Sequence, residues 1–558
     1  MKQTPIDQKI KPRFKPSLMN VAVRNSIFVL GFAHASAQAA SITVTSLSDF
    51  NLLNTGATCT LREAVESINE QSLRPGCVNS GAGFGANDTI TVSAGLSNQT
   101  ITLAGQEITI GDAEGVPVDL TLQASNVTVN ANSQSRVFSV TSQSRVSIDG
   151  LNFQNGHAIG FQENPYAGIG GAIFVNPDAS LSLSNSTVSN NYANYGGGAL
   201  FSFNAEGVSI ENSHFSGNLS ARGGGAVFVY GEQAVQILDS EFSQNRAGYL
   251  ADGTASSFTS GVDGGAISAL YYSNVTIADS TISANRSRDD GGAVEVINAS
   301  VTFQNSVISE NVAQDNGGAV FIRYGGLISA KQSTFSSNTA LTASGGAISS
   351  YNGFGDGVID VELQQSTISG NSAARDGGGI EFSGRRLTVS NSTISGNSAA
   401  IGGGIQGERD ISLVELINST VNNNSATSSG GISIVRDTSL SLINSIVANS
   451  VGGDCNLDGT ITIDSATLIE DASCNALRFG DPGLLDLADN GGSTLTHALQ
   501  ADSPAINSGL ADTCLEFDQR GERRDSVCDI GAFESNPVSG GNLFVIPLPN
   551  GKTVMFEL

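Results

Sequence analysis

Aspartate recurs beside Gly-Gly pairs in the middle of this chain, at Asp263, Asp289, Asp290 and Asp315. If the segments that carry them stack on one another, the carboxylates repel each other and raise their own pKa values. A hard cation with oxygen ligands relieves that repulsion, so these four residues are the candidate metal ligands and calcium is the candidate ion. Alternatively, the aspartates are turn formers that point into water, and the protein needs no cofactor.

Two other outcomes are open for these acidic positions. Guanidinium groups from the equivalent turns, on Arg222, Arg288 and Arg375, could neutralise them. Paired carboxyl groups also divide the acid and base roles in enzymes that cleave polysaccharides. Further catalytic constellations are scarce, because past residue 39 the histidines are few and far apart, and the sequence contains no G-x-S-x-G nucleophile motif and no spare cysteine. The catalytic residues are therefore unknown, and we favour a protein that is not an enzyme.

Two long insertions, 156–169 and 247–262, extend turns on the edge that carries the aspartates. Insertions on one face of a repeat protein often mark a binding face. Exposed tyrosine rings beside carboxylates stack on sugars or anchor a protein partner, so we expect a glycan or a surface protein as partner. The candidate ligand-face residues are Tyr166, Tyr192, Tyr195, Tyr249 and Asp376.

A repeat of about 27 residues must position these side chains. Each repeat contains a phrase that closes on asparagine, and a second phrase, Gly-Gly followed by Ala or Ile, keeps the same spacing. Apolar and polar residues alternate within a repeat, as at Val208, Ser209 and Ile210, which predicts short strands separated by turns. This periodicity indicates an all-β solenoid of parallel strands. The closing asparagines are Asn191, Asn218, Asn245, Asn285, Asn311, Asn338, Asn371, Asn397 and Asn424.

Both phrases have a structural task in such a solenoid. Equivalent residues on successive coils lie ~4.8 Å apart, so the amide side chains of the closing asparagines can bond along the axis as a ladder. We therefore assign these asparagines to structure. The Gly-Gly pair predicts a tight corner that requires a positive φ or a close backbone approach.

The first 39 residues are typical of a secretory signal with cleavage after Ala39. Their apolar stretch, 27–33, is too short to span a membrane, so we expect no transmembrane segment after its removal. Starting at Met19 instead of Met1 would give a more ordinary signal, and the choice stays open. Without residues 1–39 the chain has 20 basic and 51 acidic residues, a net charge of −31. That charge argues against nucleic acid as a partner.

Six cysteines form three local pairs in the sequence, and none of them lies in the clear repeats. In an exported protein this spacing favours disulfides that staple the two ends of the solenoid, where a repeat lacks a neighbour. Zinc is not expected, because no C-x-x-C spacing or nearby histidine accompanies them. The expected pairs are Cys59 with Cys77, Cys455 with Cys474, and Cys514 with Cys528.

The segment from Cys59 to Ala64 predicts the only convincing helix of the chain. Thr60 and Glu63 can form a capping box, and the helix would cover the open end of the first coil. With Asn87-Asp88-Thr89-Ile90 and Asp149-Gly150-Leu151, these residues closely resemble the CSLREA-domain family of exported bacterial β-helix proteins. The resemblance covers roughly 42–155 and implies an N-terminal cap over 40–84.

The repeats and the C-terminal part carry two further resemblances. Gly-Gly-Ala and Phe-x-x-Asn phrases, such as Phe215 to Asn218, resemble polymorphic outer membrane protein repeats. They imply a right-handed parallel β-helix of pectate-lyase-like fold over 85–480, clearest over 149–449, and in some relatives adhesion. Residues 481–534 look like the choice-of-anchor Q module of surface and secreted bacterial proteins. The tail, 535–558, predicts a hairpin with its turn at Pro549-Asn550-Gly551.

These observations lead to one functional hypothesis and one alternative. We expect a non-enzymatic β-helix protein, exported to the cell surface, the outer membrane or the medium, that acts in adhesion or in matrix or glycan interaction. The alternative is a polysaccharide lyase or glycoside hydrolase of pectate-lyase-like fold. The sequence leaves the ligand, the mode of anchoring and the oligomeric state open.

Overall fold

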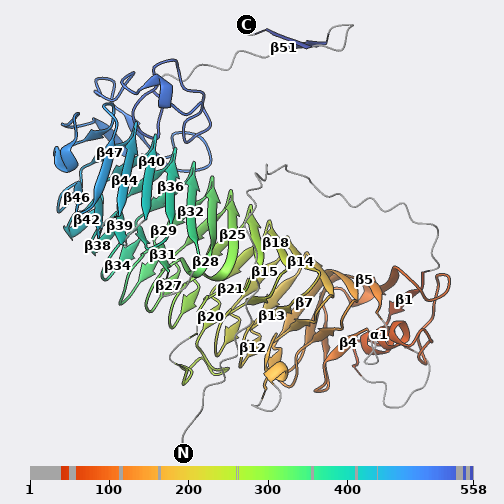
Figure 1. The fold of residues 1–558 in the computed structure, drawn as a ribbon. Helices are drawn as coiled ribbons and strands as arrows, with labels where there is room; N and C mark the ends of the chain where they lie inside the picture. Colours follow the sequence, from red (N-terminus) through yellow and green to blue (C-terminus); the bar gives the residue numbers. More distant parts are fainter. Residues whose placement is uncertain are drawn as a thin grey trace, which may run out of the picture. The chain divides into compact units, whose positions relative to one another are not determined.

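The computed structural model describes most of the chain beyond the expected signal. The described residues are 39–49, 58–111, 117–160, 165–258, 261, 263–352, 357–408, 412–436, 438–535, 544–547 and 553–556. The predicted signal sequence therefore lies outside the described residues, apart from its last position. From residue 39 onward the repeats stack into an elongated parallel β-helix (Figure 1).

Each complete coil contributes strands to four parallel columns, which we number in chain order from the strand before the Gly-Gly pair. Column 1 contains β8 (His157–Ala158), β12 (Tyr192–Ala193), β16 (Leu219–Ser220), β20 (Arg246–Ala247), β24 (Arg286–Ser287), β27 (Val312–Ala313), β30 (Thr339–Ala340), β34 (Ser372–Ala373), β38 (Ser398–Ile401) and β42 (Ser425–Ser428). Column 2 follows the Gly-Gly pair and contains β4 (Ile108–Ile110), β6 (Phe138–Val140), β9 (Ile173–Val175), β13 (Leu200–Phe203), β17 (Val227–Tyr230), β21 (Ile267–Leu270), the first parts of β25 (Val294–Gln304) and β28 (Val320–Lys331), β31 (Ile348–Tyr351), β35 (Ile380–Phe382), β39 (Ile405–Glu408), β43 (Ile432–Val435) and β46 (Cys455–Leu457).

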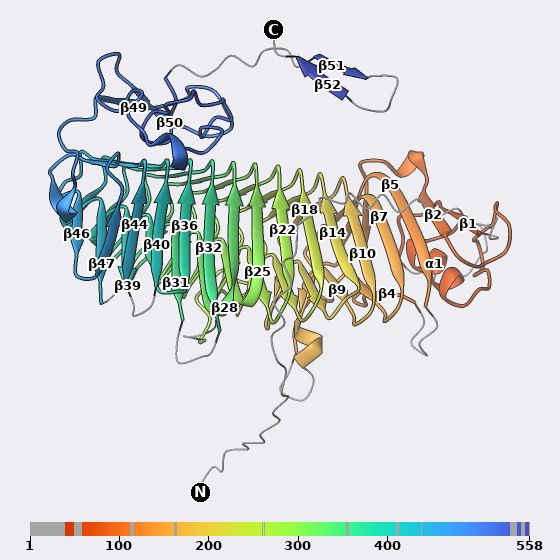
Figure 2. The ribbon, with the colours of Figure 1, turned by 45° about the horizontal axis from the view of Figure 1, so that its top comes forward.

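Columns 3 and 4 complete the coil. Column 3 contains β1 (Ser41–Val44), β2 (Asp88–Val92), the first parts of β5 (Asp119–Asn130) and β7 (Arg145–Gln154), β10 (Ser180–Ser184), β14 (Gly207–Glu211), β18 (Ala234–Leu238), β22 (Asn274–Ala278), the second parts of β25 and β28, β32 (Ile359–Gln364), β36 (Arg386–Ser390), β40 (Leu413–Ile417), β44 (Ser439–Ile443) and β47 (Thr460–Ile463). Column 4 contains β3 (Thr100–Thr102), the second parts of β5 and β7, β11 (Thr187–Ser189), β15 (His214–Ser216), β19 (Glu241–Ser243), β23 (Thr281–Ser283), β26 (Val307–Ser309), β29 (Thr334–Ser336), β33 (Thr367–Ser369), β37 (Thr393–Ser395), β41 (Thr420–Asn422), β45 (Ile446–Ala448) and β48 (Leu468–Ile469). Figure 2 shows the strands of column 3 side by side along the solenoid.

The predicted alternation of apolar and polar residues produces one continuous core. In β14, Val208 and Ile210 point inward and are buried, whereas Ser209 between them lies on the outer face. Residues in register then stack on their own kind, and the rings of Phe215 and Phe242 lie 4.7 Å apart between centroids. Since this core is linear, each coil is stabilised mainly by its two neighbours.

The closing asparagines form the ladder that the sequence predicts. The Asn218 side chain donates to Asn245 Oδ1 at 2.9 Å and to a backbone oxygen, and it accepts from Asn191 at 2.9 Å. The same pattern continues from Asn285 to Asn424. These side chains are fully buried, so the ladder satisfies polar groups inside the solenoid rather than binding a ligand.

The Gly-Gly corner also has the expected geometry. Gly224 adopts φ of +61°, a region that side chains other than glycine rarely occupy. A Cβ atom at Gly225 would lie 2.0 Å from the backbone oxygen of Gly265 on the next coil. Both glycines are therefore required, one for the turn and one for the close stacking of successive corners.

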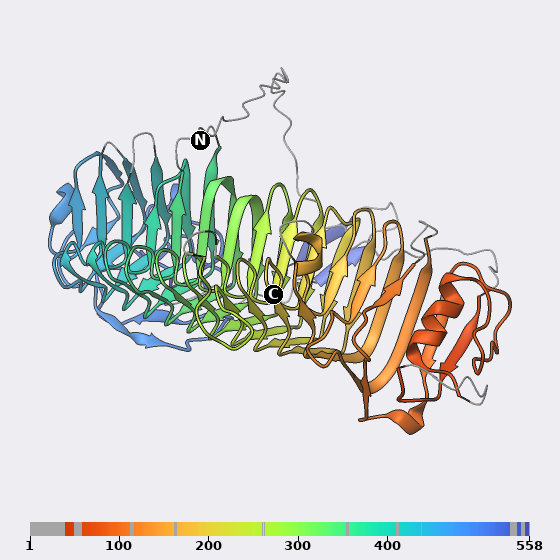
Figure 3. The same cartoon turned by 90° about the horizontal axis from the view of Figure 1, so that it is seen from below.

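A helix closes the N-terminal end (Figure 3). In α1 (Leu61–Asn69), the predicted capping box forms, because the Thr60 side chain accepts from the N–H of Glu63 and the Glu63 carboxylate accepts from the N–H of Thr60. The apolar face of α1 packs against β1, β2 and β4. The β1 strand pairs in parallel with β2, so the first coil begins within the segment 40–84 that we assign to the cap.

The segment after the last coil packs on the C-terminal coils and carries β49 (Leu484–Ala488), β50 (Thr496–Leu499) and the short 3-10 turn η4 (Ala511–Thr513). The Gln519 amide bonds Thr367 at 2.9 Å and Thr393 at 2.6 Å, and His497 Nε2 lies 2.9 Å from Ser395 Oγ. This segment, which we call the module, is therefore bound to column 4.

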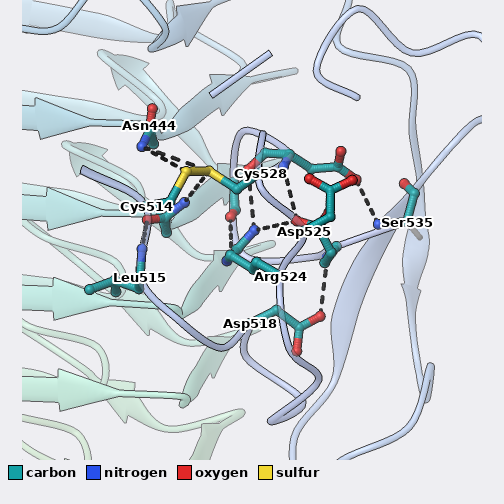
Figure 4. A network of polar contacts seen from close by, with 12 residues as sticks. Asn444, Cys514, Leu515, Asp518, Arg524, Asp525, Cys528 and Ser535 are labelled. Carbon is teal, nitrogen blue, oxygen red and sulfur yellow. Dashed lines mark hydrogen bonds and ion pairs between the residues drawn. A yellow bond between two sulfur atoms is a disulfide. The ribbon is translucent and has the colours of Figure 1, made fainter. Parts of the chain in front are cut away.

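A buried polar network completes this attachment (Figure 4). Arg524 donates to Asn391 Oδ1 at 3.1 Å and to Glu534 at 3.2 Å, so it links a corner of the solenoid to the end of the module. The Asn444 amide points toward the adjacent disulfide. All three expected disulfides form: Cys59–Cys77, Cys455–Cys474 and Cys514–Cys528.

Past the module, β51 (Phe544–Pro547) and β52 (Thr553–Phe556) pair antiparallel, as the predicted hairpin requires. The turn residues between them lie outside the described residues. The remaining short 3-10 turns are η1 (Ala94–Leu96), η2 (Pro165–Gly168) and η3 (Ser473–Asn475). Within the described part of the chain, no helix has the length and apolarity that a membrane span requires.

Candidate functional site

A groove of about 520 Å³ runs over the outer face of column 2, from β28 to β43. The outward residues of these strands form its floor, because side chains alternate between the two faces of a strand. The turns before the Gly-Gly pairs form one wall, and residues at the ends of the column 2 strands form the other. The groove is lined by Asp290, Asn316, Phe321, Arg323, Tyr324, Ser344, Ser349, Tyr351, Arg375, Asp376, Glu381, Glu408 and Arg436.

The first wall is a ladder of polar turn residues at equivalent positions on successive coils. The backbone N–H of Asp290 donates to Asp263 Oδ1 at 3.0 Å, and the N–H of Asn316 donates to Asp290 Oδ1 at 2.8 Å. Ser344 N–H donates to Asn316 Oδ1 at 3.2 Å, and Ser344 Oγ lies 3.4 Å from Asp376. These side chains therefore fix the turn that they occupy, in addition to any role toward a ligand.

Arg323 supplies the positive charge for this wall. Its Nη2 donates to Asp263 Oδ2 at 2.8 Å and to Glu295 Oε1 at 2.9 Å, although these carboxylates lie on the two preceding coils. The guanidinium also lies 5.6 Å from the ring centroid of Tyr324. One arginine therefore links the acidic turn to the aromatic side of the groove.

The arginines that the sequence offers for this role lie elsewhere. Arg222 packs over Phe258, with 4.0 Å from the guanidinium carbon to the ring centroid, and Arg288 donates to the backbone oxygen of Ser256 at 2.7 Å. Both brace the insertion 247–258 instead of the aspartates. Arg375 lines the groove but is exposed. The expectation that turn arginines neutralise turn aspartates is therefore wrong, because the arginine that does so extends from a strand.

Burial shifts the acidic groups toward their protonated forms. Desolvation, followed by the nearby Glu295 carboxyl, raises the pKa of Asp263 well above its usual value. Desolvation and Asp263 raise the pKa of Asp290 to about 7 and that of Asp289 to about 6. At neutral pH this cluster therefore holds protons, and Arg323 and the shared protons lower its net negative charge.

Three of the four predicted metal ligands come together. Oxygens of Asp263, Asp289 and Asp290 lie within 4.8 Å of one another. Asp315 is not part of that group, since its side chain accepts from Thr342 while its N–H donates to the backbone oxygen of Asp289. Both Asp263 oxygens already accept hydrogen bonds. The oxygens that stay available are few compared with the six to eight ligands that calcium takes, so the fit to calcium is poor.

Glu381 forms the floor at the centre of the groove. It is buried, and its carboxyl oxygen accepts from Ser349 Oγ at 2.7 Å and from the N–H of Ser350 at 3.3 Å. Desolvation raises the pKa of Glu381 to about 8 despite these hydrogen bonds. On the next coil, Gln406 occupies the same position, and its buried Oε1 has no partner among the described residues. The floor therefore presents a neutral carboxyl group, whereas Gln406 is buried and does not line the groove.

The second wall combines rings and charges. Tyr324 and Tyr351 are 42% and 47% exposed, so part of each side chain can contact a ligand. Arg375 and Arg436 are exposed at the groove and form no ion pair within the described part of the chain. Tyrosine rings, guanidinium groups and carboxyl groups in one groove can stack on sugar rings and bond their hydroxyl or carboxylate oxygens.

The residues of the predicted ligand face lie in different surroundings. Asp376 lines the groove. Tyr192 is 8% exposed, because it lies within column 1 and packs edge-on against His157, so the expectation of an exposed ring is wrong there. Tyr195 is partly buried under Arg222, and Tyr249 is half-buried beside Arg246. The side chain of Tyr166 lies outside the described residues.

The sequence did not single out Glu381, Arg323, Tyr324 and Tyr351, because the predicted ligands were turn and insertion residues. These four residues lie in strands. One signal was available. Glu295 and Glu381 each stand inside an otherwise apolar strand directly after the Gly-Gly phrase. An acidic residue inside an otherwise apolar, buried strand is unfavourable unless it has a specific role, and this pattern could have marked the face.

The comparisons with known proteins bear on the fold. A family model described as "Right handed beta helix region" matches residues 171–356. The coil is right-handed. No curated protein matches this chain in sequence.

Similar solved structures include the periplasmic alginate epimerase AlgG, at 10% identity and a TM-score of 0.35, over 78% of this chain and 94% of that chain. They also include pectate lyase Pel9A, at 13% identity and a TM-score of 0.32, over 90% of this chain and 98% of that chain. Together with the parallel columns, the matched family model makes the protein a right-handed parallel β-helix.

Proposed function

We propose that this protein is an exported or cell-surface β-helix that binds a polysaccharide and acts in adhesion or matrix interaction without catalysis. The observation that carries the proposal is the groove over β28 to β43, in which Tyr324 and Tyr351 lie beside carboxyl and guanidinium groups. These groups project from stacked strands, so the site is held rigid before any ligand arrives. Binding then costs little conformational entropy.

The charge of the groove supports a neutral or acidic sugar chain. Glu381 is protonated at neutral pH, since its pKa is about 8, and Asp290 is partly protonated, since its pKa is about 7. Arg375 and Arg436 then balance Asp376 and Glu408 at the groove. The groove is therefore close to neutral on a strongly acidic chain, and a uronate carboxylate can pair with either exposed arginine.

Export is supported by the cysteines. Three disulfides form and no cysteine is free. Disulfides form and persist in oxidising compartments outside the cytosol. They lie at the two ends of the repeats, where they hold the terminal coil and the module in place. We include cell-surface exposure in the proposal because adhesion requires it.

A glycan array tests this function. Linear neutral, uronate and amino-sugar glycans should be compared with host-matrix proteins as ligands of the full exported chain. Tyr351→Ala should weaken glycan binding about tenfold, the effect of losing roughly 1.4 kcal/mol of stacking. Tyr272→Ala is the matched control, because Tyr272 is 76% exposed and does not line the groove. A glycan affinity that Tyr351→Ala does not change, or an array in which no glycan binds, would contradict the proposal.

A second candidate function, cleavage of the bound polysaccharide, is favoured by the pKa of Glu381. A buried carboxyl group with a pKa near 8 can act as a general acid at neutral pH, and Asp376 and Glu408 line the same groove. A reducing-end assay on the glycans that bind decides between the two. Release that disappears in both Glu381→Gln and Asp290→Ala would establish an enzyme, whereas binding without release supports the adhesive function.

A further inference from the structure

A strip of exposed aromatic residues continues the groove toward the N-terminal coils. The outward position at the end of each column 2 strand is in register over six successive coils. It is occupied by Phe203, Tyr230, Leu270, Ile297, Arg323 and Tyr351. We call these residues, with Tyr271 and Tyr324 that follow two of the strands, the aromatic strip.

Three rings of the strip contact one another along the axis. Tyr230 lies 5.3 Å from Phe203 and 5.0 Å from Tyr271 between ring centroids. Leu270 and Ile297 are buried, so the coil of Ile297 separates the rings up to Tyr271 from those of Tyr324 and Tyr351. Tyr271 is 40% exposed. Several exposed rings on one face of a soluble protein mark an interaction site.

The strip and the groove meet at Tyr324 and Tyr351. Column 2 passes from β13 through β17, β21, β25, β28, β31, β35 and β39 to β43, which is eight steps from one coil to the next. At ~4.8 Å per step, the combined surface is about 38 Å long. It is therefore far longer than a short oligosaccharide needs, and it runs parallel to the axis of the solenoid.

We propose that the bound polysaccharide is a linear chain that lies along the solenoid axis, with sugar rings stacked on the aromatic strip and its other end in the groove. This inference deepens the proposed function and rests on it. The step between coils is close to the length that one sugar unit adds to an extended chain, so successive units meet equivalent positions. Tyrosine supplies such stacking surface at a low cost in side-chain entropy.

The shape of the strip argues against a protein partner. Specific protein interfaces bury about 800 Å² on each partner over a broad patch. The strip is narrow: beside Tyr230 the outward position carries the partly exposed ring of Phe228, and beside Tyr351 it carries the buried Ser349. The narrow aromatic strip therefore fits a thin, extended ligand better than the broad surface of a globular protein.

Length-defined oligosaccharides test the inference by calorimetry on the full exported chain. The probes are trimers and hexamers of galacturonate, of cellulose and of chitosan, which are anionic, neutral and cationic. The hexamer of the recognised series should bind about tenfold more tightly than its trimer, because it gains roughly one more stacking contact. Tyr271→Ala should weaken the hexamer severalfold and leave the trimer unchanged, whereas Tyr351→Ala should weaken both.

The controls keep the two proposals apart. Tyr272→Ala should change neither affinity, and the thermal unfolding of all three variants should match that of the native protein. Equal affinities for trimer and hexamer, or a hexamer affinity that Tyr271→Ala does not change, would overturn binding along the solenoid axis. The proposed binding in the groove would still stand. If no series binds, or only a protein partner does, the proposed function itself fails.

Discussion

Arg323 shows how a single side chain changes the chemistry of an acidic turn. Asp263, Asp289 and Asp290 have the spacing of a metal site, yet the guanidinium already pairs with Asp263 and with Glu295. The remaining charge is reduced by protonation, since the pKa values of Asp289 and Asp290 are about 6 and about 7. A cation therefore has little to neutralise.

The calcium response follows from this arrangement. Calcium should raise the melting temperature no more than sodium chloride does at equal ionic strength, because generic screening is all that it contributes. Asp290→Asn should leave that response unchanged. Thermal unfolding in chelator, in calcium and in matched salt measures the effect. A calcium-specific stabilisation that Asp290→Asn removes would instead establish a metal site by mass action.

Glu381 makes the stability of the folded protein depend on pH. Its folded-state pKa is about 8 against an ordinary 4.5, so the folded state binds the proton more tightly than the unfolded state. The carboxyl group therefore favours folding fully below pH 4.5, and this contribution is lost as pH rises toward 8. Glu381→Gln removes this titration. The difference in free energy of unfolding between this variant and the native protein should therefore grow in favour of the variant from pH 5 to pH 8, by on the order of 3 kcal/mol.

Urea unfolding of both proteins at pH 5 and pH 8 checks this. Glu362→Gln, which changes an exposed glutamate on β32, is the matched control and should show no such gain. A constant difference between Glu381→Gln and the native protein at the two pH values would mean that Glu381 titrates normally. The groove would then lose its candidate general acid.

The element that specifies the fold is the coil with its asparagine ladder. Asn311 donates to Asn338 and to the backbone oxygen of Ile282, and it accepts from Asn285. Asn311→Ala leaves two buried backbone groups unsatisfied, at Asn285 and Ile282, and should cost about 2–5 kcal/mol. Asn274→Ala, at an exposed position of β22, should cost less than about 0.5 kcal/mol. Chemical denaturation of both variants measures the difference, and equal costs would contradict the ladder.

The same element explains what the sequence could and could not predict. The alternation of apolar and polar residues around Val208 and the recurrence of asparagine are local patterns, so the coils and the ladder were predictable from them. The helix was predictable from its capping box. The partners of Asp263 were not, because Arg323 reaches across two coils and no local pattern shows that reach. Tyr192 was wrongly predicted to be exposed because the insertion beside it suggested an open edge. In the structure Tyr192 lies in β12, which pairs with β8, and its ring contacts His157.

In the whole molecule, the stacked coils align the groove and the aromatic strip along column 2, with one step from each coil to the next. The C-terminal module packs on column 4 and does not line the groove. A linear polymer is the ligand that uses such a surface fully. The fold alone does not decide between binding and cleavage, since function depends on the groove residues.

The structure of the protein in complex with the galacturonate, cellulose or chitosan hexamer that binds most tightly decides whether the ligand lies along column 2. We expect sugar rings against Tyr324 and Tyr351, with the chain parallel to the solenoid axis and its end over Glu381. A hexamer bound to the outer face of column 3, on the module, or at the insertion edge beside Tyr249 would contradict this expectation.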